Sequence, residues 1–221
     1  MLRDKAEKLF QRLKNPVDLF GGINMTWLRV CVFAVAIGIY VGIINQIPFL
    51  YDTSFRDIAI THEWWVLFAV LIVSNSKGPL DAGLKCFVFF LISQPVIYII
   101  ELPTIGLQAA LSYWLKIWLP ITILTLPGGA VAYFSKKQNA LGAVILGIGN
   151  AIVGILCVHY VTAVCSAFPR HLLTVVFCVA IIALLLFSIQ RKMSTRLLSA
   201  GTTALLVAGA VIVAKIANLS I

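Results

Sequence analysis

Hydrophobic runs of membrane-spanning length recur along this chain from about Met25 to its last residue, and only short polar connections separate them. A bilayer core about 30 Å thick is crossed by a helix of about 20 apolar residues. Charged residues make up 11% of the sequence and hydrophobic residues 61%, whereas a soluble domain carries about 25% charged residues. The sequence therefore predicts an all-α, polytopic membrane helix bundle and excludes a soluble domain.

About seven transmembrane helices are predicted. The second is the least regular, because it is short and begins with His62, Glu63 and the pair Trp64-Trp65. Tryptophan prefers the headgroup region, so this pair indicates an interfacial anchor, and the bundle has six spans if the segment does not cross. The predicted spans are 25–47, 60–75, 84–102, 112–134, 140–163, 171–190 and 197–217.

The first residues form a separate predicted element, an amphipathic basic helix over 1–16, followed by a single transmembrane domain over 17–221. Apolar residues recur at helical spacing among lysines and arginines, and Asn15-Pro16 ends the helix. Such a helix beside a span is expected to lie on the inner leaflet and to bind anionic headgroups of the lipid bilayer. Docking to a cytosolic partner is the alternative.

Basic residues are distributed unequally over the predicted topology. With the N-terminus inside, only Arg56, Lys116, Arg170 and Lys215 fall outside, which leaves 13 of the 17 basic residues on the cytoplasmic side. Because cytoplasmic connections carry the excess of lysine and arginine, we expect a cytoplasmic N-terminus and an extracytoplasmic C-terminus. The expected location is the plasma membrane of a prokaryotic cell. The net charge of +9 then needs no nucleic-acid partner.

Helix breakers coincide with uncharged polar residues in the middle spans. Pro95 lies near the centre of the third span, and Pro120 and the run 127–129 (Pro-Gly-Gly) interrupt the fourth. Proline removes an amide donor and clashes with the preceding turn, so we expect kinked or opened helices there. At bilayer depth, freed backbone groups are tolerated only against protein or a water-filled cavity.

Five uncharged polar residues near this depth form the predicted substrate-binding site of the bundle. Transporters build midplane sites from such groups beside broken helices. The alternative is that the same groups form hydrogen bonds between helices, each worth about 1 kcal/mol. These residues are Ser93, Gln94, Thr122, Thr125 and Asn150.

The first span carries small residues at every fourth position, namely Ala34, Gly38 and Gly42. We call these three residues the small-residue ladder. Ladders of this kind let helix backbones approach closely. The ladder predicts either packing inside the bundle or an interface on the first helix for another membrane subunit.

Histidines gather on the predicted outer side, where His62, Glu101 and His159 form an alternative metal site. Histidine and glutamate ligate zinc. However, the sequence has no HExxH spacing, no CxxC pair and no GxxxxGK[ST] loop. We therefore expect neither a metal nor a cofactor, and placement at the interface is the simpler explanation of the histidines.

The segment 165–171 (Cys-Ser-Ala-Phe-Pro-Arg-His) resembles the cysteine segment of exosortase-type membrane transpeptidases, in which arginine and histidine follow an outward cysteine. The match covers fewer than ten residues, and the last span offers only Lys215 where those enzymes have a further arginine and histidine. The resemblance implies a peptidase- or transpeptidase-like enzyme on the extracytoplasmic face. Its catalytic residues would be Cys165, Arg170 and His171, because nearby cations favour a nucleophilic thiolate.

Three function classes remain. The first is a small-solute membrane carrier, or the membrane-embedded substrate-binding subunit of a transporter, with a neutral polar midplane site and an unknown ligand. In size the chain is similar to the binding subunits of energy-coupling-factor vitamin transporters, which is a likeness of fold class alone. The second is the membrane cysteine enzyme, and the third is a non-catalytic assembly, immunity or sensory protein. The broken middle spans favour the first class, which is not an enzyme.

Overall fold

The computed structural model describes residues 22–60 and 62–217. Within these residues, seven helical segments are long and apolar enough to cross a membrane. All regular structure in the described residues is helical, which confirms an all-helical chain with seven helices of spanning length. The predicted surface helix over residues 1–16 lies outside the described residues. The segments are Trp27–Asn45, Ser54–Ser74, Pro79–Ile105, Leu107–Lys136, Ala140–Ser166, Leu172–Ile189 and Met193–Ile216.

The first two spans differ in regularity. Helix α2 (Trp27–Asn45) begins at the N-cap Thr26, whose side chain accepts a hydrogen bond from the amide of Arg29. After the short turn η2 (Pro48–Leu50), the second span consists of α3 (Ser54–Ile60) and α4 (His62–Ser74). This span therefore starts six residues before the predicted boundary at residue 60.

The third and fourth spans keep their helical path through most of the prolines. Helix α5 (Pro79–Ile105) runs without interruption past Pro95, so of the two expected outcomes, a kink or an opening, the helix does not open there. The fourth span comprises α6 (Leu107–Tyr113), the π-helical turn η3 (Trp114–Trp118), α7 (Leu119–Ala132) and the 3₁₀ turn η4 (Tyr133–Lys136). Its irregular turn comes directly before Pro120, where the missing amide loosens the helical ladder.

The last three spans are regular helices: α8 (Ala140–Ser166), α9 (Leu172–Ile189) and α10 (Met193–Ile216). Asn139 caps α8, because its side chain accepts from the amide of Gly142. The connection between α9 and α10 is held by Gln190, which donates to the carbonyl of Ser135 at 2.9 Å. Short connections of this kind make consecutive helices antiparallel neighbours.

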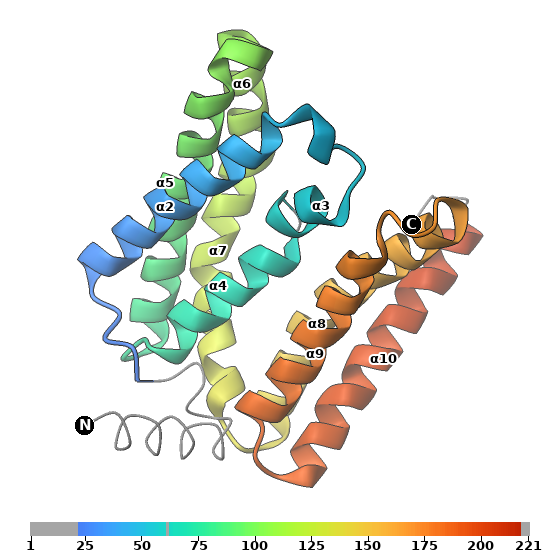
Figure 1. The fold of residues 1–221 in the computed structure, drawn as a ribbon. Helices are drawn as coiled ribbons and strands as arrows, with labels where there is room; N and C mark the ends of the chain where they lie inside the picture. Colours follow the sequence, from blue (N-terminus) through green and yellow to red (C-terminus); the bar gives the residue numbers. More distant parts are fainter. Residues whose placement is uncertain (1–21, 61, 218–221) are drawn as a thin grey trace, which may run out of the picture.

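The helices form two groups with α4 between them (Figure 1). Helices α2, α5 and α7 pack together in the first group, and α8 packs with α9 and α10 in the second. Helix α4 contacts α5 on one side and α8 and α9 on the other. We call the boundary between the two groups, along α4, the seam.

Each group has a buried core, and α4 contributes to both. Trp65 of α4 lies against Phe89 and Phe90 of α5, with ring centroids 6.1 and 5.5 Å apart. The next residue, Val66, packs against the core of α8 and α9 that contains Leu146. Consecutive residues of one helix thus serve different cores, because each step turns the side chain by about 100°.

The small-residue ladder packs inside the chain. Ala34 is fully buried, and Gly38 and Gly42 lie against α5. A Cβ atom added at Gly38 would lie 2.7 Å from the carbonyl oxygen of Ser93, and one at Gly42 would lie 3.0 Å from Ile100 Cβ. In this structure the ladder is therefore a packing surface between α2 and α5.

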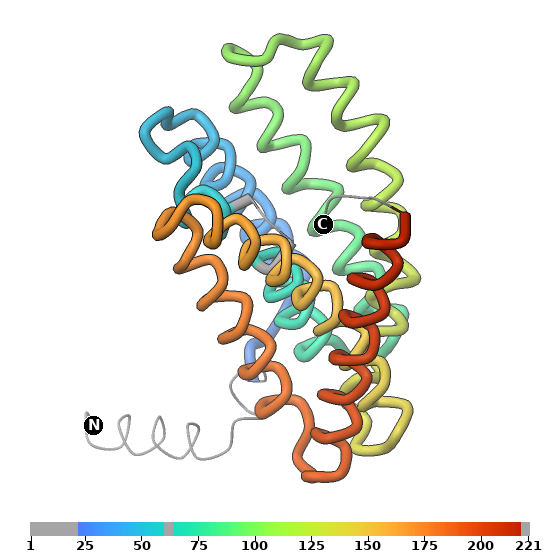
Figure 2. Tube along the Cα trace, turned by 90° about the vertical axis from the view of Figure 1, so that its right-hand side faces the viewer, coloured from blue at the N-terminus to red at the C-terminus, as the bar shows by residue number. Residues whose placement is uncertain are grey.

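The helix connections gather at two ends of the bundle (Figure 2). One end holds the start of α2 and the connections 75–78, 137–139 and 190–192, and we call it the lysine-rich end. The opposite end holds the connections 46–53, 106 and 167–171. In the described residues the lysine-rich end carries most of the basic side chains, among them Lys77, Lys136 and Lys192.

Candidate functional site

A cavity of about 660 Å³ lies at the seam, between α4, α5, α7 and α8. We call it the seam cavity. Along the fourth span its lining residues run from Trp118 to Ser135. At 1.5 Å per residue this stretch measures about 25 Å, which approaches the thickness of a bilayer core. The cavity is therefore elongated along the helices.

The walls of the seam cavity change in character along its length. Toward the opposite end they are aromatic and apolar, with Trp65 from α4 and Trp118 from η3. Thr125 lies midway, and its hydroxyl donates to the carbonyl of Thr122 at 2.6 Å. Toward the lysine-rich end the hydroxyl residues Ser74 and Ser135 join the lining.

Glycines create the space of the seam cavity. Gly128 of α7 and Gly149 of α8 both line it, and a Cβ atom added at either would meet nothing within 4 Å. The neighbouring Gly129 has the contrary role, because an added Cβ there would lie 3.1 Å from Cys86 of α5. Gly129 therefore lets α7 approach α5 closely, while the preceding residue, Gly128, leaves space in the cavity.

A lysine adjoins the cavity at the lysine-rich end. The ammonium group of Lys136 donates to the carbonyls of Val73 (3.1 Å), Ser74 (3.4 Å) and Ser76 (3.3 Å). Val73 and Ser74 also line the cavity. Carbonyls at a helix C-terminus lack intrahelical partners and carry a partial negative charge, so Lys136 closes the end of α4.

The predicted substrate-binding residues are not brought together at this cavity. Thr125 lines it, whereas the other four are buried to 0–1% exposure and belong to the lining of neither described cavity. At least one buried side-chain polar atom of each has no hydrogen-bond partner among the described residues, so the alternative of interhelical hydrogen bonds gains no support either. These four residues are Ser93, Gln94, Thr122 and Asn150.

A polar cluster at the opposite end joins α3 to the start of α9. Asp57 Oδ2 lies 2.7 Å from His171 Nδ1 and accepts from the hydroxyl of Thr174 at 2.9 Å. The hydroxyl of Ser54 donates to the carbonyl of Arg170 at 2.9 Å. We call these contacts the α3–α9 clasp. They attach the second span to the second helix group.

The alternative catalytic residues take part in this clasp. His171 contacts Asp57, and the backbone of Arg170 binds Ser54. Cys165 is exposed, and the hydrogen bonds recorded for the described residues do not join it to either basic residue. Sequence reasoning missed Ser54 and Asp57, because their partners lie more than one hundred positions further along the chain.

The alternative metal ligands are spread over separate contacts. Glu101 accepts from the side-chain amide of Asn45 at 2.5 Å. His159 is exposed and packs edge-on against the ring of Tyr160. The side chain of His62 lies outside the described residues. Within the described part of the chain, no three His, Cys, Asp or Glu residues are placed to hold a metal ion.

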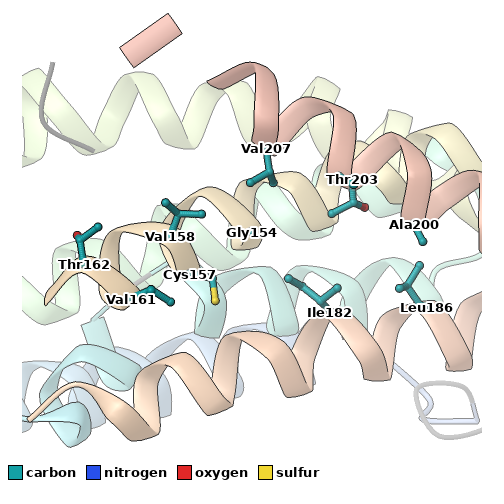
Figure 3. Close-up of a pocket in the computed structure, with 11 residues that line it drawn as sticks. Gly154, Cys157, Val158, Val161, Thr162, Ile182, Leu186, Ala200, Thr203 and Val207 are labelled. Carbon is teal, nitrogen blue, oxygen red and sulfur yellow. The ribbon is translucent and has the colours of Figure 1, made fainter. Parts of the chain in front are cut away.

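A second cavity of about 380 Å³ lies between α8, α9 and α10 (Figure 3). Cys157 and Val158 of α8, Ile182 of α9 and Val207 of α10 are among its lining residues. Its walls are apolar apart from Thr162 and Thr203, and the hydroxyl of Thr203 already donates to carbonyls on α8 and α10. It is smaller than the seam cavity and has no charged residue in its lining.

Glycine and tryptophan positions are the sequence signals that mark the seam cavity, although their pattern alone does not show which helices enclose it. Gly128 and Gly149 supply the space, and Trp65 and Trp118 supply the aromatic end.

Comparisons of the chain with protein-family models, with curated proteins and with solved structures found no match.

Proposed function

We propose that this protein binds a small, mainly apolar molecule in the seam cavity, as a small-solute membrane carrier or as the membrane-embedded substrate-binding subunit of a transporter. The cavity itself carries the proposal. Ligand sites usually measure about 300–1,000 Å³ and have apolar walls with a few polar groups. A cavity of about 660 Å³ with three hydroxyl residues, Ser74, Thr125 and Ser135, meets this description.

The position of the cavity also supports a carrier. Transporters hold their ligand near the membrane centre, between two groups of helices that rock against each other. Here the cavity lies at the seam, and α4 contacts both groups. Relative movement of the groups would change the width of the cavity without unfolding either core.

We further propose that the lysine-rich end faces the cytoplasm of a prokaryotic cell. Among the described residues, the opposite half of the bundle contributes Arg56, Lys116, Arg170 and Lys215, and the remaining basic side chains lie toward the lysine-rich end. Cytoplasmic connections carry this excess. Under this orientation the N-terminus is cytoplasmic and the C-terminus is extracytoplasmic.

Filling the cavity tests the binding function. In Gly149→Phe the new side chain enters the cavity, because a Cβ atom at residue 149 meets nothing within 4 Å. Gly209→Phe is the matched control: residue 209 also has nothing within 4 Å, but it is exposed on α10 away from both described cavities. The probe is the apolar fluorophore N-phenyl-1-naphthylamine, and binding is followed by energy transfer from tryptophan in detergent.

We expect Gly149→Phe to weaken binding of the probe at least ten-fold, while Gly209→Phe binds it like the unmodified protein. The ten-fold change corresponds to about 1.4 kcal/mol of lost contact. Equal binding by the two variants would show that the fluorophore occupies another part of the protein or the micelle, and would contradict the proposed site.

A further inference from the structure

We infer that the ligand of the seam cavity is a single-chain amphiphile with an anionic head group, whose tail lies along the cavity and whose head lies at Lys136. The inference rests on the proposed function and specifies its ligand class. Three properties of the cavity carry it: its length, the gradient of polarity along it, and the charge beside one end.

The dimensions of the cavity fit one extended hydrocarbon chain. The cavity has a volume of about 660 Å³ and a length of about 25 Å. An extended apolar chain can lie along this length in van der Waals contact with the lining.

The lining gives the chain a direction. The end at Trp65 and Trp118 is aromatic and apolar, and the end at Ser74 and Ser135 carries hydroxyl groups. An apolar tail placed at the aromatic end leaves the head beside hydroxyls at the lysine-rich end. The reverse orientation would place a polar head at the more apolar end, away from the hydroxyl groups, which is unfavourable.

The charge next to the hydroxyl end selects an anion. Lys136 donates to the carbonyls of two cavity-lining residues, Val73 and Ser74. The ion pairs recorded for the described residues join other groups, and Asp81 at the same end pairs with Lys85 at 2.7 Å. The ammonium group of Lys136 also lies 3.9 Å from the ring centroid of Tyr133. Among the described residues its charge therefore faces carbonyl dipoles and an aromatic ring but no carboxylate, so a carboxylate or phosphate head group would complement it.

Tail-brominated amphiphiles test both the orientation and the charge. Bromine at the far end of a long chain quenches a nearby tryptophan, and Trp118 lines the predicted tail end. Three probes of equal chain length are compared: a fatty acid, a lysophosphatidate and an uncharged alcohol. We expect both anions to quench at concentrations about ten-fold lower than the alcohol, and Trp118→Phe to remove much of the quenching. The more tightly bound anion identifies the head group as carboxylate or phosphate.

Lys136→Gln removes the charge while keeping a donor for the carbonyls that end α4. We expect it to abolish the preference for anions over the alcohol, and Lys136→Arg to retain that preference. The matched control is Lys137→Gln, because the neighbouring Lys137 is exposed and lies over the ring of Phe134. It removes an equal charge and should leave the preference unchanged.

The outcomes separate the ligand class from the proposed function. If the unmodified protein binds the alcohol as tightly as the anions, the anionic head group is refuted, and this comparison needs no variant. Loss of the preference in Lys137→Gln but not in Lys136→Gln would also refute the assignment to Lys136. If Gly149→Phe binds all three probes normally, the seam cavity is not the site and the proposed function fails with it.

Discussion

The same substitution, glycine to alanine, should lower the free energy of unfolding at one position of α8 and leave it unchanged or raise it two residues further along. Gly147 faces α10, and a Cβ atom added there would lie 2.6 Å from Thr202 Cβ and 2.8 Å from the carbonyl oxygen of Ser199. Gly149 faces the seam cavity, and an added Cβ would meet nothing within 4 Å. Gly147→Ala therefore forces α8 and α10 apart, whereas Gly149→Ala does not.

The size of the effect follows from these distances. Carbon atoms pack at about 3.5–4.0 Å, so α10 must move by about 1 Å to accommodate a methyl group at residue 147. Overpacking of this kind costs about 1–3 kcal/mol, and the movement also weakens the hydrogen bond from Thr203 to the carbonyl of Gly147 at 3.2 Å. Replacing glycine by alanine inside a helix by itself stabilises the helix by about 1 kcal/mol. We expect a net loss of about 1–2 kcal/mol in Gly147→Ala and a gain of up to about 1 kcal/mol in Gly149→Ala.

Thermal unfolding in detergent measures the difference. For a chain of this size 1 kcal/mol shifts Tm by about 2–4 °C, so Gly147→Ala should unfold several degrees below the unmodified protein and Gly149→Ala at or above it. Gly209→Ala, exposed on α10, should behave like Gly149→Ala. Destabilisation of all three variants to the same extent would refute the argument, since it would show that flexibility of glycine and not helix contact sets the stability.

Three further predictions concern other parts of the chain. A reporter fused after Ile221 should be active on the extracytoplasmic side, and cytoplasmic activity would mean that the number of spans is even. Asp57→Asn removes the carboxylate that contacts His171 and Thr174 in the α3–α9 clasp and should lower the free energy of unfolding by about 1–2 kcal/mol, which a thermal melt beside the unmodified protein would measure. A membrane-impermeant thiol reagent should label the exposed Cys165 but not the buried Cys86, and Cys165→Ser should leave ligand binding intact; loss of binding would favour the enzyme alternative.

The number of spanning helices could be predicted because apolar length is a local property of the sequence. The start of the second span could not, since Arg56 and Asp57 make its first turn look polar. Both side chains find partners outside their own helix: Arg56 lies over the ring of Tyr51, and Asp57 contacts His171. Contacts outside the helix, one of them with a residue more than one hundred positions away, thus allow a span to begin earlier than hydropathy alone predicts.

The candidate site was harder to predict because it depends on helix rotation. Each residue along a helix turns its side chain by about 100°, so depth in the membrane does not show which neighbour a side chain meets. Thr125 faces the seam cavity, while Thr122, three positions earlier, is fully buried outside its lining. Gly149, which shapes the cavity, has no side chain to suggest a role.

The shared position of α4 has a consequence for the order in which the chain assembles. This helix has only 13 residues, and its two faces are covered by α5 on one side and by α8 and α9 on the other. In a chain synthesised from its N-terminus, α5 follows within a few residues, but the helices that cover Val66 are made much later. Until then that face of α4 meets lipid, so the second span reaches its final surroundings only after α9 has entered the membrane.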